Sequence, residues 1–160
     1  QSFPTSRREF LKRTGTFAAA TVVVGASFPY VHAAEGNTIQ LALIGCGGRG
    51  SGAVVNAYDS PNGPVKLVAM ADLFPKRMAS SYANLTAKYG DRIDVPTERQ
   101  FIGFDAYRNA IDCLRPGDVA MLTGYAGFRP AQVEYAVERG IHVFMEKTFA
   151  SGVPGLRRII

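Results

Sequence analysis

The sequence predicts an α/β protein built on a doubly wound parallel sheet, and three observations support this fold class. An apolar run at 39–44 leads directly into a glycine-rich segment at 45–50. Short apolar runs then alternate with helix-like segments, and an acidic residue, Asp72, ends the second of these runs. Alternation of strands and helices at this spacing is typical of right-handed βαβ units, which place their strands in parallel.

Glycine and proline residues divide the segment 38–160 into strands and helices. Each expected strand is rich in apolar residues, as in parallel strands that are buried on both faces. The strands are expected at 39–44, 65–71, 99–102, 118–122 and 141–145. The helices are expected at 49–59, 76–89, 104–114, 130–139 and from 152 onward. Pro75 at the start and Gly90 at the end mark the second helix, and the polar segment 91–100 is expected to be irregular.

The glycine-rich segment matches the pattern G-x-G-x-x-G between a strand and a helix, which is typical of Rossmann dinucleotide-binding domains. Gly45 is expected to permit a tight turn, Gly47 to let a pyrophosphate approach the backbone, and Gly50 to allow close packing of helix on strand. Gly48 and Arg49 stand where the helix begins, so its unpaired N–H groups and positive end face the phosphates. A flexible loop without a ligand is the alternative, and the ordered sequence of strand, loop, helix, strand and acid argues against it.

Asp72 stands at the distance from the glycine-rich segment at which a carboxylate reaches the hydroxyls of the adenosine ribose. Because a carboxylate there repels a 2′-phosphate, the sequence favours NAD over NADP as the cofactor. Lys76 and Arg77 can reduce this repulsion, which keeps NADP possible, although such residues are more often solvated. Asp72 can also act as a helix N-cap ahead of Pro75.

Two later loops follow strands at the edge where open parallel sheets bind their ligands. Thr123 begins the first loop, which is expected to border the nicotinamide ribose; an ordinary strand-to-helix connection is the alternative. Glu146 and Lys147 begin the second. A desolvated lysine beside a nicotinamide can orient or deprotonate a substrate hydroxyl, and Glu146 can position the ribose or the lysine. A solvated Glu–Lys pair explains the same residues equally well, and His142 is expected in the core or at an edge of the sheet.

Composition argues against two classes of site. Four basic residues and one acidic residue within the first thirteen positions supply +3 of the net charge of +5, so no basic stripe suggests nucleic acid. Cys46 and Cys113 are expected to be unpaired thiols, because neither belongs to a metal-binding or disulfide pattern. We therefore expect no metal site and no nucleic-acid partner.

The N-terminal segment 1–33 is predicted to be an export signal. Residues 6–12 (SRREFLK) match the twin-arginine signal and precede a moderately apolar stretch, with a plausible cleavage site after Ala33. A transmembrane anchor is the alternative, but the strongly apolar part at 17–28 is too short to span a bilayer. The sequence thus predicts a protein that uses the twin-arginine export machinery, is folded before export and reaches the periplasm.

Several segments of the chain carry a resemblance to a known family: 45–50, 71–72, 103–107, 127–130 and 142–147. Together they resemble the Gfo/Idh/MocA oxidoreductases, in particular an exported, twin-arginine branch, over the segment 38–160. The resemblance implies a Rossmann domain, a larger C-terminal domain that supplies most substrate contacts, and a homo-oligomer. It also implies hydride transfer between NAD(P) and a sugar or polyol. The family's Glu-Lys-Pro motif maps to Glu146, Lys147 and Thr148, which implies that Lys147 is catalytic and lies beside the nicotinamide.

Two departures from the family pattern bear on function. Thr148 replaces the family's proline, so the backbone after Lys147 loses a fixed φ, and the usual Thr-Pro is absent at 123–125. The C-terminal domain is absent from the sequence, so we expect a fragment without turnover of its own. An NAD-dependent glycosidase of the same superfamily and a non-catalytic nucleotide-binding domain remain alternatives to the oxidoreductase.

Overall fold

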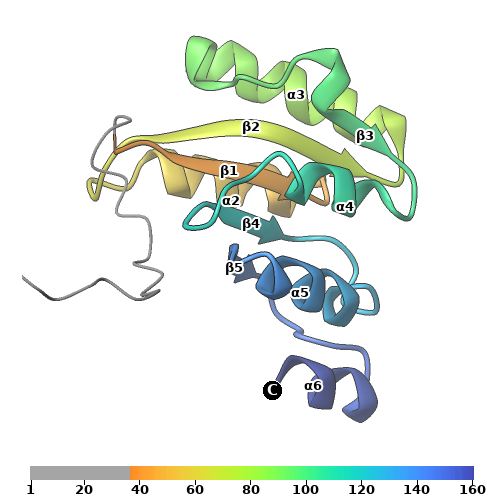
Figure 1. Cartoon of the computed structure of the whole chain (residues 1–160). Coiled ribbons are helices and arrows are strands. Elements are labelled where there is room, and N and C mark those ends of the chain that lie inside the picture. The colour runs from red at the N-terminus through yellow and green to blue at the C-terminus, as the bar shows by residue number, and fades with distance from the viewer. Residues whose placement is uncertain (1–36) are drawn as a thin grey trace, which may run out of the picture. The chain divides into compact units, whose positions relative to one another are not determined.

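Residues 37–160 are described by the computed structural model, in which five parallel strands form one sheet. The strands are β1 (Ile39–Ile44), β2 (Val65–Asp72), β3 (Gln100–Ile102), β4 (Val119–Leu122) and β5 (His142–Met145). Their order across the sheet is β3-β2-β1-β4-β5 (Figure 1). All pairings are parallel, so the predicted doubly wound α/β fold is confirmed.

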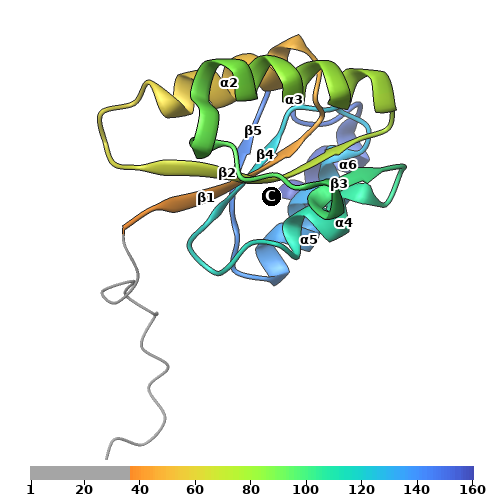
Figure 2. The same ribbon diagram turned by 90° about the horizontal axis from the view of Figure 1, so that it is seen from above.

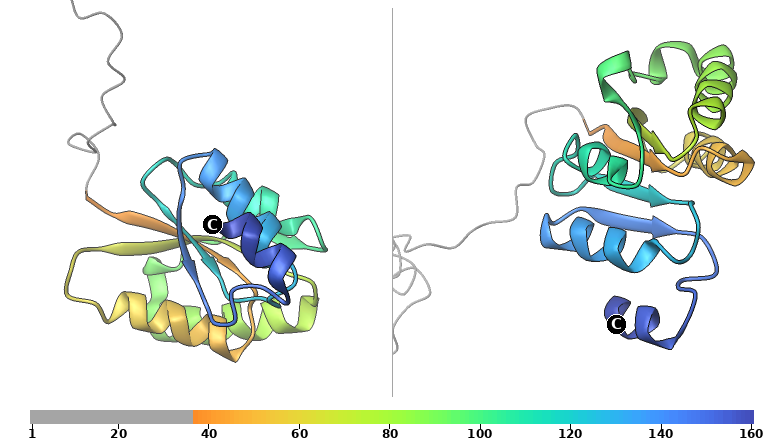
Figure 3. Two further views of the ribbon diagram at one scale, coloured as in Figure 1. Left: turned by 90° about the horizontal axis from the view of Figure 1, so that it is seen from below. Right: turned by 90° about the vertical axis from the view of Figure 1, so that its right-hand side faces the viewer.

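Helices cover both faces of the sheet (Figure 2). One face carries α2 (Gly48–Tyr58) and α3 (Pro75–Tyr89), and the other carries α4 (Ala106–Ile111) and α5 (Arg129–Glu138). The last helix, α6 (Val153–Ile159), packs beside α5, as both views of Figure 3 show. The sheet is thus the middle layer of three.

The central strand β1 shows why a sheet forms here. Leu41 and Leu43 point into a core shared with α2 and α3, while Ala42 and Ile44 point into a core shared with α4 and α5. All four side chains are buried, which matches a strand covered on both faces. Burial of apolar surface on both sides is the main force that holds the three layers together.

The strand register places the functional loops at one edge of the sheet. Ile44, the last residue of β1, pairs with Ala71 of β2 and with Leu122 of β4. Leu122 in turn pairs with Met145 of β5. Because paired parallel strands end level with one another, the segments that follow β1, β2, β4 and β5 meet at the same edge. The chain reverses its winding between β1 and β4, the position at which open α/β sheets bind ligands.

The structure differs from the sequence-based expectations mainly between β2 and β4. The segment expected to be irregular contains two short 3₁₀ turns, Gly90–Arg92 and Thr97–Arg99. The helix expected at 104–114 is shorter at both ends. Before it, the chain turns at Gly103 (φ 125°), whose carbonyl accepts a hydrogen bond from the Ala106 N–H; after it, the Leu114 N–H turns back to the carbonyl of Ile111. His142 lies exposed on the edge strand β5, which agrees with the second of the two positions expected for it.

The proposed export signal at 1–33 lies outside the described residues. Within the segment 37–160, no helix combines the length and the apolar character that crossing a membrane requires.

Candidate functional site

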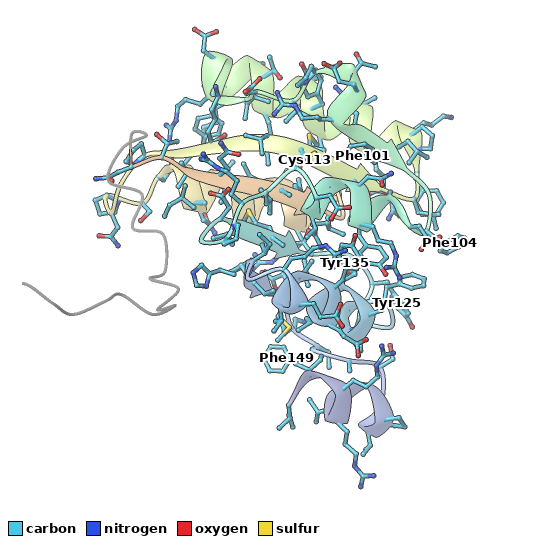
Figure 4. All side chains as sticks on the ribbon, viewed as in Figure 1. Phe101, Phe104, Cys113, Tyr125, Tyr135 and Phe149 are labelled. Carbon is cyan, nitrogen blue, oxygen red and sulfur yellow. The ribbon has the colours of Figure 1, made fainter. Side chains whose placement is uncertain are left out.

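A cleft of about 320 Å³ opens at the carboxyl ends of the strands. Residues at or after the ends of four strands line it: Gly45 and Gly47 follow β1, Asp72 ends β2, Gly103 and Phe104 follow β3, and Thr123, Gly124 and Tyr125 follow β4. Phe104 and Tyr125, two exposed aromatic side chains of this wall, lie beyond the strand ends (Figure 4). The volume lies at the lower end of the range for small-molecule sites, which suits part of a dinucleotide.

The glycine-rich segment is shaped by close backbone approaches. Gly45 has φ +100°, and a Cβ atom there would lie 2.4 Å from the Gly124 nitrogen. A Cβ atom on Gly50 would lie 2.1 Å from the carbonyl oxygen of Gly45. The steric part of the glycine prediction is therefore confirmed: Gly45 forms a turn that only glycine accommodates well, and Gly50 allows close packing.

Open space surrounds the next two glycines of this segment. A Cβ atom on Gly47 or Gly48 would meet no described atom within 4 Å. Gly47 is the N-cap of α2, and no side chain caps that helix. No described side chain therefore occupies the N-terminal end of α2, an arrangement that suits an anion. Contact of Gly47, Gly48 and Arg49 with a pyrophosphate stays a prediction.

The carboxylate of Asp72 joins the end of β2 to the glycine-rich segment. Its Oδ2 accepts a hydrogen bond from the Cys46 N–H (2.6 Å), and its Oδ1 accepts one from the Phe74 N–H (2.8 Å). The N-cap of α3 is Phe74, so the expectation that Asp72 caps this helix is wrong by two residues, although the carboxylate does bind the backbone of the N-cap. Each carboxylate oxygen retains a lone pair that can accept a ribose hydroxyl.

Thr123 ties the loop after β4 to the glycine-rich segment. Its N–H donates to the carbonyl of Ile44 (2.9 Å), and its hydroxyl donates to the carbonyl of Gly45 (2.7 Å). This side chain lines the cleft, so the position predicted for Thr123 at the ligand edge is observed. The hydrogen bonds also give it a structural role that its sequence position did not reveal.

Glu146 pairs with Arg49 across the sheet edge. Arg49 Nη2 lies 2.5 Å from Glu146 Oε1, and the glutamate is buried while the arginine is exposed. The hydrogen bond from Arg49 lowers the pKa of Glu146 below its ordinary value, and the same bond raises the pKa of Arg49. The sequence placed both residues at the ligand edge but did not predict that they bind each other.

Lys147 follows this pair and is exposed, and it is not among the residues that line the cleft. The peptide bond between Lys147 and Thr148 is cis. A catalytic role for Lys147 stays a prediction.

The sequence analysis gave Arg129 no role of its own, although the structure places it at the site. It begins α5, is 4% exposed, and donates hydrogen bonds to the carbonyl oxygens of Glu146, Thr148 and Gly124. The available signal was an arginine next to Pro130 at a helix start, and it gave no indication of which carbonyls the side chain binds. Burial lowers its pKa, while the nearby charge of Glu146 opposes that shift.

A more polar hollow lies on the α2 side of the glycine-rich segment. Gly48, Arg49, Lys76 and Arg77 contribute to its wall, together with serine side chains of α2 and α3. The guanidinium of Arg77 also lies 4.8 Å from the centre of the Phe74 ring and lines the main cleft. Arg77 therefore lines the same cleft as Asp72, whereas Lys76 lines the polar hollow but not that cleft. Among residues 37–160, no three candidate ligands gather as a metal site would need.

The buried thiol of Cys46 provides a test of the glycine-rich segment. Burial and the charge of Asp72 raise the pKa of Cys46 to about 12. Because the thiolate is the reactive form, we expect an aromatic disulfide reagent to modify only Cys113, which is half-buried, in the native protein. Cys46 should react only in denaturant, and a Cys113→Ser variant should show no fast phase. Rapid reaction of both thiols under native conditions would contradict this arrangement.

The ion pair of Glu146 and Arg49 predicts a pH dependence of stability. Since the pKa of Glu146 is lowered on folding, its contribution is complete above the ordinary value of 4.5 and is lost as the pH falls through the lower value. The difference in unfolding free energy between wild type and Glu146→Gln should therefore shrink from about pH 7 to about pH 3. Urea denaturation at several pH values measures it, and a difference independent of pH would contradict the pairing.

Comparison with solved structures finds known proteins with a similar fold. Neither a family model nor a curated protein matches the sequence. A myo-inositol dehydrogenase from Lactobacillus casei, solved with NAD(H) and myo-inositol, is 17% identical with a TM-score of 0.59; the match covers 76% of this chain and 32% of that one.

Two further solved structures are similar. The WlbA dehydrogenase from Bordetella pertussis, solved with NADH and UDP-GlcNAcA, is 23% identical with a TM-score of 0.55, over 76% of this chain and 31% of that one. The 3-ketoreductase KijD10 from Actinomadura kijaniata, solved with NADP, is 20% identical with a TM-score of 0.53, over 77% and 34%.

These likenesses establish the fold. The chain shares the α/β fold of these three solved proteins and spans about a third of their length.

Proposed function

We propose that residues 38–160 are the NAD(P)-binding Rossmann domain of an oxidoreductase of the Gfo/Idh/MocA type. The proposal rests mainly on the hydrogen bond between Asp72 and the glycine-rich segment. The carboxylate accepts it from the Cys46 N–H, in a cleft at the carboxyl ends of the strands. This arrangement holds a buried carboxylate, suited to ribose hydroxyls, beside a helix start that no described side chain caps. The solved proteins with this fold, which hold NAD(H), NADH or NADP, support the same cofactor class.

The residues present fit the adenosine and pyrophosphate parts of such a cofactor. The space over Gly47 and Gly48 leaves the α2 N–H groups open to phosphate oxygens, and Asp72 retains lone pairs for ribose hydroxyls. The buried carboxylate of Asp72 favours NAD, whereas Lys76 and Arg77 keep NADP possible. A bound nicotinamide supplies hydride acceptance or donation. In this proposal, Lys147 holds or moves the proton of a substrate hydroxyl, and Thr123 and Glu146 lie toward the nicotinamide ribose.

The proposed substrate is a sugar or polyol, on the basis of the family resemblance and of the myo-inositol and UDP-GlcNAcA ligands of the similar structures. In the proposed intact enzyme a C-terminal domain supplies most substrate contacts, and the enzyme is a homo-oligomer. We therefore expect cofactor binding without turnover from the 160 residues alone. Net NADH production by a longer form, measured against glycoside release, separates the oxidoreductase from the NAD-dependent glycosidase.

Titration with NADH tests the proposed function. The fluorescence anisotropy of the reduced nicotinamide should rise as the chain binds NADH, and an excess of NAD should reverse this rise by competition. The protein contains no tryptophan, so the nicotinamide signal is free of tryptophan fluorescence. A folded protein that leaves the anisotropy unchanged at millimolar concentration would refute the proposal and favour a domain that binds no nucleotide.

We also propose that the N-terminal segment directs export of the folded protein to the periplasm by the twin-arginine route. Fusion of residues 1–36 to a reporter that folds in the cytoplasm should export the reporter. Replacing Arg7 and Arg8 with lysine should retain it inside the cell, whereas replacing Arg13 should have no effect. Export that is indifferent to the arginine pair would exclude this route.

A further inference from the structure

The segment Glu146–Thr148, here called the lysine segment, is fastened on both sides of Lys147. Arg129 Nη1 donates to the carbonyl oxygen of Glu146 and to that of Thr148. Arg129 Nη2 donates to the carbonyl of Gly124 at 2.8 Å. One buried guanidinium thus connects the residues before and after Lys147 to the loop after β4.

Other contacts hold Glu146 as well. Its N–H donates to the carbonyl of Leu122 at 3.2 Å, and its carboxylate pairs with Arg49 of the glycine-rich segment. The residue before Lys147 is therefore fixed through its N–H, its carbonyl and its side chain, while the side chain of Lys147 itself is exposed. A backbone fixed on both sides of Lys147 sets the point and the direction from which its side chain leaves the loop, and a supporting shell of this kind is what a ligand-facing residue requires.

The chemistry of Arg129 suits this task. A guanidinium presents five N–H donors in a rigid plane and can reach carbonyls on two loops at once, whereas a lysine ammonium is a point charge on a flexible stem. A buried charge without a directly bonded carboxylate is costly, so its presence calls for an explanation beyond packing. Thr148 also lacks the fixed φ of proline, which leaves the lysine segment in need of an external constraint.

We propose that Arg129 is a positioning residue for Lys147, holding the backbone on both sides of it so that the lysine side chain faces the nicotinamide end of the cofactor. This inference rests on the proposed function, because it requires a nicotinamide beside Lys147. It predicts that loss of Arg129 affects the nicotinamide end of the cofactor while the adenosine and pyrophosphate end is unaffected.

Paired titrations of the full chain with NADH and ADP-ribose test this inference. ADP-ribose shares the adenosine, the pyrophosphate and the second ribose with NADH but lacks the nicotinamide. In Arg129→Lys we expect the dissociation constant for NADH to rise about tenfold, while that for ADP-ribose changes less than about twofold. Arg139→Lys is the matched control, since Arg139 lies at the other end of α5 and binds Asp112, and it should change neither constant.

Each outcome decides the question. Equal weakening of both ligands in Arg129→Lys would overturn the inference, because a general structural role predicts it, and so would no change in either. Arg129→Gln, which removes the buried charge, replaces the lysine variant if thermal melting shows that the latter is unfolded. Failure of wild type to bind either ligand would instead refute the proposed function. In the 13C spectrum of reductively methylated protein, NADH should shift the Lys147 signal in wild type but not in the Arg129 variant.

Discussion

Replacing Gly50 with alanine is expected to destabilise the domain by about 3 kcal/mol. The new Cβ atom would lie 2.1 Å from the carbonyl oxygen of Gly45 and 2.7 Å from the hydroxyl oxygen of Thr123. Neither neighbour can move freely, because Thr123 donates hydrogen bonds to the same stretch of backbone. Helix α2 must therefore shift away from β1. Urea denaturation measures the loss of unfolding free energy.

Gly52→Ala is the matched control for this substitution. Gly52 lies in the same helix, and a Cβ atom there would meet nothing within 4 Å. Because alanine favours helix more than glycine does, this variant should gain up to about 1 kcal/mol. Similar unfolding free energies for the two variants would mean that the close approach of Gly50 to Gly45 is absent in solution. If the two unfolding free energies were similar and Gly50→Ala alone lost NADH binding, that loss would come from a change confined to the glycine-rich segment.

The fold could be predicted from the sequence because its signals are local. The apolar runs and the glycines and prolines between them predicted all five strands, and the fingerprint around Gly45 and Gly50 predicted the turn and the close packing that the structure contains. The position of Asp72 beside that turn follows from the strand order, since β1 and β2 are neighbours. Helix bounds were less accurate where a positive φ, as at Gly103, bends the chain early.

The contacts around the lysine segment could not be predicted in the same way. Arg129 reaches carbonyls in two loops, and Arg49 reaches a glutamate at the far end of the domain sequence. Such contacts depend on where side chains point after the layers have packed, and no periodicity or spacing in the sequence records that direction. Sequence reasoning therefore located the edge at which the loops after the strands meet, but not the hydrogen bonds that organise it.

Replacing Asp72 with asparagine is expected to affect both stability and cofactor binding. The carboxylate accepts two backbone N–H groups, and an asparagine side chain can accept only one of them while its NH₂ group faces the other. We expect a loss of about 2 kcal/mol of unfolding free energy. The dissociation constant for NADH should also rise by about tenfold or more, since the ribose hydroxyls and the Cys46 N–H lose the same acceptor.

Asp118→Asn separates these two effects. Asp118 is also buried and accepts the Gln40 N–H and the Arg115 N–H, each at 2.9 Å, but it precedes β4 and so lies at the opposite end of the strands. This variant should lose a similar amount of stability and keep the NADH affinity of wild type. If both asparagine variants weakened NADH binding equally, the effect at Asp72 would reflect general destabilisation. A weaker affinity in Asp72→Asn alone, measured far below its melting temperature, would locate the adenosine ribose at the end of β2.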